Sequence, residues 1–211
     1  MCLATAQARP GCYYSGELAG TRACSGTVRI LEEHIVSPRV TPRKDPQTIT
    51  PDGQSIGPRI EGLGVHARPL IADKRGEIIE AYNPAWGLHP EPLVYVYQVV
   101  LRPGAIKGWV VHRHQDDRVF TCSGAMRWVF FDNRPDSPTY RLINELVIGE
   151  RNRTLVITPA GVFHAVQNIG PAEAVFINMP TRPYDHGDPD KYRLPIKNEL
   201  IPFDFDDPRG W

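Results

Sequence analysis

The chain lacks several features that mark large classes of protein. Its 24 lysines and arginines are balanced by 24 aspartates and glutamates, so it has no net charge and no basic footprint of a nucleic-acid binder. No apolar run approaches the ~20 residues of a membrane-spanning helix. The first residues lack a basic segment followed by a long apolar core, so we expect no secretory signal. These absences predict a cytoplasmic protein that binds neither nucleic acid nor membrane.

Cysteine is scarce as well, with 4 residues in 211. Cys2, Cys12 and Cys24 crowd the first part of the chain without a Cys-x-x-Cys pair, and Cys122 stands alone. This spacing favours reduced thiols over a disulfide framework or a zinc knot. Helix signals are weak, whereas 21 prolines and 18 glycines punctuate short apolar runs. That pattern is typical of an all-β architecture.

Residues 1–58 differ in composition from the rest. They hold scattered Gly, Pro, Ser and Thr, and the repeated prolines of residues 37–59 disfavour helix. We expect residues 1–58 to form a partly irregular N-terminal arm, either draped over a partner subunit or disordered. Residues 59–211 are predicted to form one domain, with a wrapping C-terminal tail that begins at Thr181.

From Ile60 onward, short apolar runs alternate with turn signals. The clearest run, Leu93–Leu101, is rich in β-branched and aromatic residues and ends at Arg102-Pro-Gly104. Short strands at this spacing favour a sandwich or a barrel. The predicted strands cover residues 65–71, 77–81, 93–101, 106–113, 118–122, 126–132, 140–148, 154–158, 163–168 and 174–179.

Three histidines stand in two of these runs. His112 and His114 lie within Gly108–Asp117, and His164 lies within Pro159–Asn168. Being two residues apart, His112 and His114 are predicted to point to the same face of a strand, which in a closed sheet lines the interior. Imidazoles placed there serve as metal ligands, as parts of a polar substrate pocket, or as hydrogen-bonded structural groups.

The two motifs resemble those of the cupin superfamily. The cupin Pro-x-Gly-x-x-His-x-x-x-Asn motif is matched by Pro159, Gly161, His164 and Asn168. The cupin His-x-His element is matched by His112 and His114, and Asp117 precedes Gly124 as the cupin acidic ligand precedes its glycine. The resemblance implies a double-stranded β-helix, the cupin jelly roll, which is commonly dimeric.

A longer stretch, from about Ile60 to Phe205, is similar to the dTDP-4-dehydrorhamnose 3,5-epimerase family, a nucleotide-sugar branch of the cupins. Arg68–Gly76 resembles the opening strand and Asp-x-Arg-Gly turn of that family. Phe131–Tyr140 matches its Asp-x-Arg-x-x-Ser-Pro-Thr turn, and Thr158–His164 matches its Ile-Pro-x-Gly-Phe-Ala-His element. The resemblance implies a metal-free enzyme that exchanges protons beside a ketone, with a His base supported by an Asp, a nearby Lys and a Tyr acid.

The chain departs from this family at the catalytic positions. The resemblance places the base at Val110, the lysine at Asp117, the tyrosine acid near Asn178 and the supporting aspartate near Asn198. Neither valine nor an amide can carry out these proton transfers. The family's arginine before glycine is Lys107, which keeps the charge but loses the bidentate fork for phosphate. We therefore expect the family's frame without its catalytic residues.

The main prediction is an epimerase or isomerase with altered acid–base residues that acts on a sugar or keto-sugar substrate, as a homodimer and without a cofactor. His112 or His114 is expected to be the base. The substrate-binding residues are expected to be Lys107, His164, Asn178 and Tyr184.

Two alternatives stay open. The first is a metal-dependent cupin enzyme, an oxygenase, isomerase or lyase, in which Zn, Fe, Mn or Ni is held by His112, His114, His164 and Asp117. Asp117 has two further readings, as a general base or as a surface partner of Arg118. The second alternative is a non-catalytic carbohydrate-binding cupin.

Overall fold

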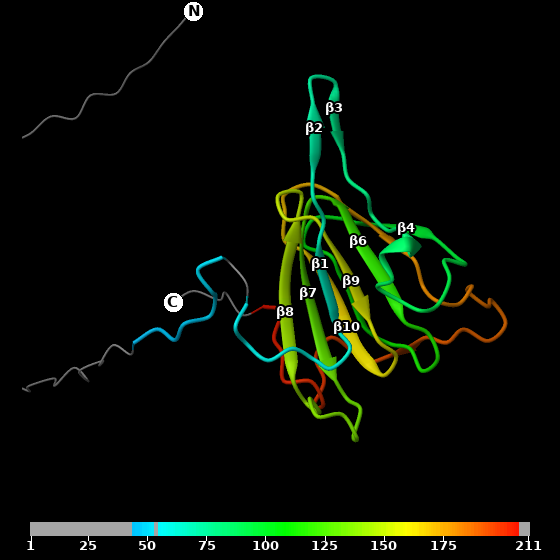
Figure 1. The fold of residues 1–211 in the computed structure, drawn as a ribbon. Coiled ribbons are helices and arrows are strands. Elements are labelled where there is room, and N and C mark those ends of the chain that lie inside the picture. Colours follow the sequence, from blue (N-terminus) through cyan, green and yellow to red (C-terminus); the bar gives the residue numbers. More distant parts are fainter. Residues whose placement is uncertain (1–43, 53–54, 207–211) are drawn as a thin grey trace, which may run out of the picture. The chain divides into compact units, whose positions relative to one another are not determined.

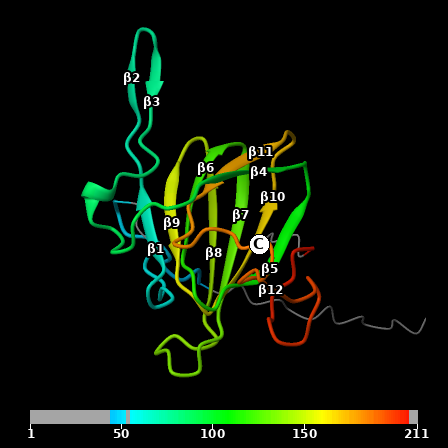
Figure 2. The ribbon, with the colours of Figure 1, turned by 90° about the vertical axis from the view of Figure 1, so that its right-hand side faces the viewer.

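Two antiparallel five-stranded sheets face each other in the computed structural model, which describes residues 44–52 and 55–206 (Figures 1 and 2). The strand order of one sheet is β1 (Gly64–Ala67), β9 (Thr154–Thr158), β6 (Asp117–Ser123), β11 (Ala174–Asn178) and β4 (Tyr97–Leu101). That of the other is β12 (Tyr192–Arg193), β5 (Ile106–Val111), β10 (Val162–Asn168), β7 (Ala125–Asp132) and β8 (Ile143–Gly149). A separate hairpin contains β2 (Ile71–Asp73) and β3 (Gly76–Ile78), and the 3₁₀ turn η1 covers Pro84–Trp86.

The chain passes repeatedly from one sheet to the other. Strands β4, β6, β9 and β11 belong to the first sheet, whereas β5, β7, β8, β10 and β12 belong to the second. This is the predicted all-β double-stranded β-helix. Within residues 44–52 and 55–206, no helix has the length and apolar character needed to cross a membrane. Most of the predicted arm of residues 1–58 lies outside the described part of the chain, which begins at residue 44 and omits residues 53 and 54.

Strand β7 shows why the interior forms where it does. Its side chains alternate between the two faces, as a strand requires. Met126, Trp128 and Phe130 point into the core between the sheets, and the Trp128 ring meets that of Phe176 edge-on at 5.0 Å between centroids. Phe131 points to the opposite face and is also fully buried. The strand is therefore apolar on both sides, because both faces of its sheet are covered.

The C-terminal segment covers the outer face of the second sheet. Trp109 of β5 is fully buried there, and its ring contacts those of Phe203 and Phe205 at 6.2 and 5.6 Å between centroids. Its indole Nε1 donates a hydrogen bond to the Ile196 carbonyl at 3.3 Å. Trp109 therefore packs away from the histidines and joins the tail to the sheet.

A buried arginine anchors the segment that leads to β4. The guanidinium of Arg118 donates five hydrogen bonds, and the residue is completely buried. The acceptors are the Tyr82 hydroxyl and the carbonyls of Glu91, Pro92, Met179 and Pro180. Arg118 thus positions the chain just before Tyr95 and Tyr97, and it forms no ion pair with Asp117. The interpretation of Asp117 and Arg118 as a surface pair is wrong, because both are buried and face different groups.

The boundaries of several predicted strands differ from the structure. Residues 93–96 are not in a strand, although their composition favours one, because only Tyr97–Leu101 pairs with β11. Strand β5 ends at Val111 rather than at residue 113, because the chain turns there. The short strand β12, which pairs with β5, was not predicted.

Candidate functional site

A cavity of about 190 Å³ lies between the two sheets, and we call it the inner cavity. Apolar side chains form much of its wall, among them Trp128 and Phe176. The polar and charged residues that line it are Tyr97, Lys107, His112, Asp117, His164, Asn178, Lys191 and Arg193. Such a mixture, with a few polar groups converging in an apolar hollow, is typical of a small-molecule site.

An irregularity in β5 decides which of its side chains enter the cavity. Lys107 is paired with Val166 of β10, and Val110 with His164, so two residues of β5 oppose one residue of β10. This is a β-bulge, which shifts the side-chain alternation by one. Lys107 and Val110 therefore both line the inner cavity, although strict alternation along the sequence would separate them.

The centre of the cavity is a buried cluster of two histidines and one aspartate. The Nε2 atoms of His112 and His164 lie 3.3 and 3.5 Å from the same atom, Oδ2 of Asp117. The two imidazole rings are 5.5 Å apart between centroids. The histidines come from the second sheet or the loop that follows β5, whereas Asp117 begins β6 of the first sheet. Opposite sheets therefore bring the three groups together.

Each imidazole is oriented by a backbone carbonyl on its other nitrogen. His112 Nδ1 contacts the Asp190 carbonyl, and His164 Nδ1 lies 3.3 Å from the Val162 carbonyl. The second oxygen of Asp117 accepts a hydrogen bond of 3.0 Å from the Gln115 amide. Because a carbonyl can only accept, each Nδ1 carries a proton and each Nε2 is directed at Asp117.

Burial and charge separate the two histidines. Burial lowers the pKa of His164 to about 4, so this imidazole is neutral at neutral pH. Burial also lowers the pKa of His112, but its hydrogen bonds to Asp117 and to the Asp190 carbonyl outweigh that effect and raise it overall. For Asp117, burial raises the pKa, yet the contact with His112 outweighs it and keeps the carboxylate ionised. The ionised Asp117 therefore lies between His112, whose pKa is raised, and the neutral His164.

Tyr97 faces this cluster from the first sheet. It is the register partner of Asn178, and its hydroxyl accepts a hydrogen bond of 2.9 Å from the Asn178 amide. Burial raises the pKa of Tyr97 to about 12, and the negative charge of Asp117 adds to this effect. The phenol therefore keeps its proton at neutral pH.

Three cations stand along the β5–β12 wall of the inner cavity. Lys191 and Arg193 are two residues apart at β12, and Lys107 reaches the same cavity from β5. Burial and the charge of Arg193 lower the pKa of Lys191. Within the described part of the chain, no carboxylate lies within 4.0 Å of these three side-chain nitrogens. This wall suits a negatively charged or electron-rich group.

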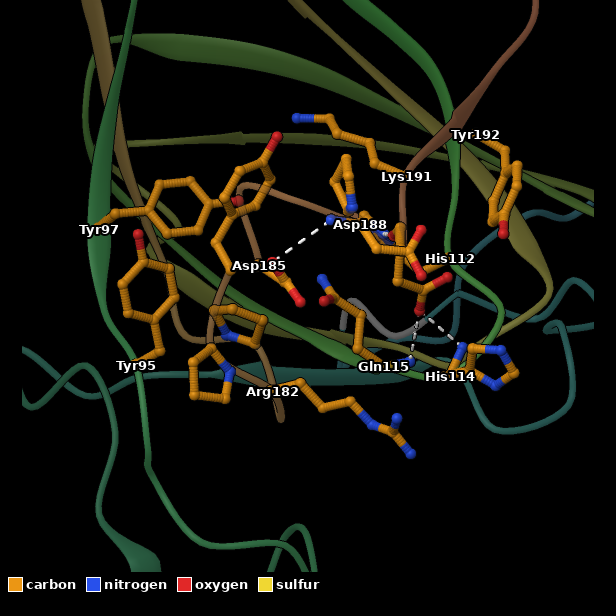
Figure 3. Close-up of a pocket in the computed structure, with 15 residues that line it drawn as sticks. Tyr95, Tyr97, His112, His114, Gln115, Arg182, Asp185, Asp188, Lys191 and Tyr192 are labelled. Atoms are coloured by element: carbon orange, nitrogen blue, oxygen red, sulfur yellow. Dashed lines mark hydrogen bonds between the residues drawn. The ribbon is translucent and has the colours of Figure 1, made fainter.

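A wider hollow of about 270 Å³, the outer cavity, adjoins the inner one and shares Tyr97, His112 and Lys191 with it. Figure 3 shows Tyr95 and Tyr97 on one side and His112, His114 and Tyr192 on the other. The remaining polar and aromatic lining residues are Gln115, Arg182, Tyr184, Asp185, Asp188 and Asp190. The tyrosines offer flat surfaces of the kind that sugars and bases pack against.

Asp190 fixes the loop that carries His114. Its carboxylate accepts hydrogen bonds from the backbone N–H groups of Arg113, His114 and Gln115 at 2.8, 2.7 and 3.1 Å. The chain therefore leaves the strand before His114, which is exposed and lines only the outer cavity. The prediction that His112 and His114 share one strand face is wrong, and His114 is not part of the cluster with His164 and Asp117.

The other candidate residues fall into two groups. Lys107, His112, Asp117, His164 and Asn178 meet at the inner cavity, whereas Tyr184 is exposed in the outer one. Sequence reasoning missed Tyr97, Lys191, Asp190 and Arg193. The alternation of Tyr97 with Val99 and Leu101 was a usable signal, because these three face the interior between exposed Gln98 and Val100.

The same cluster meets the requirements of a metal site in its donor set. One atom from each of His112, Asp117 and His164 lies within 4.8 Å of the others, and all three residues are buried. Two imidazoles and a carboxylate suit a divalent transition metal. In metal sites the other ring N–H of a histidine ligand usually donates to a carboxylate, a backbone carbonyl or water, and both histidines here face a backbone carbonyl.

The comparison with known families agrees with this architecture. The family model described as dTDP-4-dehydrorhamnose 3,5-epimerase matches residues 58–195. The chain belongs to this family. The match covers all strands of both sheets and every residue of the inner cavity.

Two curated relatives act in the synthesis of glycans, according to their names. The probable low-salt glycan biosynthesis epimerase Agl13 of Haloferax volcanii is 32% identical over 141 residues, which is 65% of this chain and 89% of the relative. The spore coat polysaccharide biosynthesis protein SpsL of Bacillus subtilis is 34% identical over 103 residues, which is 49% of this chain and 68% of the relative. The chain is thus a sugar-epimerase-like family member.

Solved structures share the fold. A dTDP sugar isomerase from Desulfovibrio desulfuricans G20 superimposes with a TM-score of 0.64 and 21% identity, covering 69% of this chain and 91% of that one. NovW, a 4-keto-6-deoxy sugar epimerase of Streptomyces spheroides, superimposes with a TM-score of 0.62 and 22% identity, covering 79% of this chain and 82% of that one. Within this family frame, Val110, Asp117 and Asn178 line the inner cavity, whereas Asn198 lies near the C-terminal turn and bonds Leu200 and Ile201.

Proposed function

We propose that the protein is an epimerase or isomerase that exchanges a proton at a carbon beside the keto group of a nucleotide-linked sugar. Family membership supports the reaction class. The observation that carries the proposal is the buried cluster of His112, Asp117 and His164 at a cavity that both sheets enclose. A neutral imidazole next to a fixed carboxylate is the arrangement that general base catalysis needs.

His164 is the better base of the two histidines. Both imidazoles direct Nδ1 at a carbonyl and Nε2 at Asp117, so their hydrogen-bond partners do not distinguish them. Their pKa values do: burial lowers the pKa of both, but the bonds of His112 to Asp117 and to the Asp190 carbonyl raise its pKa overall, whereas the pKa of His164 stays low. The Nδ1 proton of His164 goes to the Val162 carbonyl, which leaves its Nε2 lone pair to take a proton. Asp117 then stabilises the imidazolium that forms, while His112 keeps Asp117 ionised. This assigns His112 a supporting role and His164 the catalytic one.

The cationic wall completes the reaction site. Removing a proton beside a ketone places negative charge on the carbonyl oxygen. Lys107, Lys191 or Arg193 is positioned to stabilise that charge. The tyrosine-lined outer cavity, including Tyr184, would hold the nucleotide or a neighbouring sugar.

Solvent exchange tests the proposal directly. The purified protein is incubated in deuterium oxide with a 4-keto-6-deoxy nucleotide sugar, and deuterium at the carbons beside the ketone is followed by NMR. We expect incorporation with the wild type and its loss in His164→Ala. His66→Ala removes a histidine outside both cavities and is expected to retain activity. Binding without any exchange would instead support a non-catalytic carbohydrate-binding protein.

A metal-dependent enzyme is a second candidate, and the convergence of two imidazole Nε2 atoms and one carboxylate favours it. His112, His164 and Asp117 would hold the ion. Bound there, a divalent metal would act as a Lewis acid toward a substrate oxygen. Elemental analysis of the purified protein is the test, with thermal stabilisation by added Zn, Fe, Mn or Ni as a second readout. Metal-free protein that still catalyses exchange in a chelator would reject this candidate.

We also propose a homodimer. The β2–β3 hairpin extends beyond the sheets (Figure 1) and exposes Leu70, Ile71 and Ile78 by 49, 60 and 67%. Grouped exposed apolar side chains are typical of an interface between subunits. Light scattering of the wild type should give twice the chain mass, and Ile71→Asp with Ile78→Asp should give a monomer. A monomeric wild type would reject the proposal.

A further inference from the structure

Tyr97 occupies a position that sequence comparison does not single out. The family resemblance puts a tyrosine acid near Asn178 on β11, where this chain has an amide that cannot donate a proton in catalysis. Tyr97 lies on the neighbouring strand β4 as the register partner of Asn178. The Asn178 amide donates a hydrogen bond of 2.9 Å to its hydroxyl oxygen. The phenol group therefore stands next to the place where the family's tyrosine is expected.

The two sheets place Tyr97 and His164 on opposite sides of the inner cavity. Tyr97 belongs to the sheet that ends at β4, and His164 to the sheet that contains β10. Both side chains line the inner cavity. A planar intermediate held between the sheets would meet the imidazole on one face and the phenol on the other.

The hydrogen bonding of Tyr97 leaves its proton available. Its oxygen accepts a hydrogen bond from the Asn178 amide, and the hydroxyl proton has no acceptor within the described part of the chain. Burial keeps this phenol protonated at neutral pH. Tyr97 also lines the outer cavity, through which a deprotonated phenol can recover a proton from solvent.

We infer that Tyr97 is the catalytic acid that completes inversion, a role moved from β11 to the adjacent strand β4. This inference rests on the proposed function. His164 removes the proton from the carbon beside the ketone, and the electron pair of that C–H bond enters the enolate. The Tyr97 O–H bond then breaks as its proton forms a new C–H bond on the opposite face. The phenolate is reprotonated from solvent, and His164 releases its proton to solvent.

The test separates proton removal from inversion. In deuterium oxide, Tyr97→Phe should still exchange the proton with retained configuration, because His164 can take it and return deuterium to the same face. Formation of the inverted sugar should fall ~10²–10⁴-fold, the usual contribution of a general acid. His164→Ala should lose both reactions. Tyr140→Phe removes an exposed tyrosine hydroxyl outside both cavities and should retain both.

A rescue variant guards against a purely structural effect. Tyr97→Phe combined with Asn178→Tyr returns a phenol to the β11 position and should recover inversion at least tenfold over Tyr97→Phe alone. The inference is overturned if Tyr97→Phe inverts the substrate at the wild-type rate, or if it loses exchange and inversion together with binding. Absence of exchange in the wild type would reject the proposed function itself, and the inference with it.

Discussion

Replacing Asp117 by asparagine tests the centre of the site, because it removes one charge and changes the side-chain volume little. Asp117 Oδ2 lies 3.5 Å from His164 Nε2, the atom that gains the proton. At that distance and an effective dielectric constant of about 20, the attraction between imidazolium and carboxylate is about 5 kcal/mol. Only part of this charge has developed in the transition state. A loss of about 4 kcal/mol predicts a rate ~10³-fold lower.

The assay is the initial rate of deuterium incorporation at saturating 4-keto sugar. Asp116→Asn is the matched control, since the Asp116 carboxylate faces His89 and the Ala160 N–H and lines neither cavity. We expect Asp116→Asn to remain within a few-fold of the wild type. An Asp117→Asn protein that folds, binds substrate and retains more than a tenth of the wild-type rate would refute the assigned role of the carboxylate.

Three further predictions concern stability and pH. Arg118→Met removes the donor of five hydrogen bonds, two of them buried and three part-buried, and should lower the free energy of unfolding by about 3–5 kcal/mol. Urea denaturation against the exposed control Arg75→Met measures the loss. Gly124→Ala places a side chain at φ +79° with its Cβ 2.6 Å from that of Ala174, so it should cost about 2–4 kcal/mol, and an unchanged melting temperature would contradict this packing. Because burial lowers the pKa of His164 to about 4, below the 6.5 of an unfolded histidine, its contribution to stability is present above pH 6.5 and is lost as pH falls towards 4. His164→Gln should therefore flatten the pH dependence of unfolding in that window, and an identical profile would argue against a neutral buried His164.

Much of the fold could be predicted because its strands carry local signals. The turn between β7 and β8 is an example. The Asp132 carboxylate accepts hydrogen bonds from Arg134, Ser137 and Thr139, all within seven residues. The Asp-x-Arg-x-x-Ser-Pro-Thr motif therefore forms its turn through hydrogen bonds between its own residues. The inward direction of His164 also follows from the sequence pattern, because β10 pairs with β7 in unbroken register on both sides of this residue.

The site could be predicted only in part, because several of its residues depend on irregular backbone. The bulge in β5 turns Lys107 inward, and the loop held by Asp190 turns His114 outward. Neither event has a signal in the alternation of apolar residues. Lys191 and Arg193 reach the cavity on a two-residue strand, β12, which is too short to show any periodicity.

The sequence by itself determined the jelly-roll fold, the family, and the presence of His112 and His164 in the interior, because strand alternation and short turn motifs act over a few residues. The tertiary structure alone decided that these histidines share Asp117 and that Tyr97 faces them from the other sheet. Those contacts join residues of opposite sheets, so they depend on how the two sheets pack. That packing also separates the two histidines, since burial lowers the pKa of His164, whereas the contacts with Asp117 and the Asp190 carbonyl raise the pKa of His112.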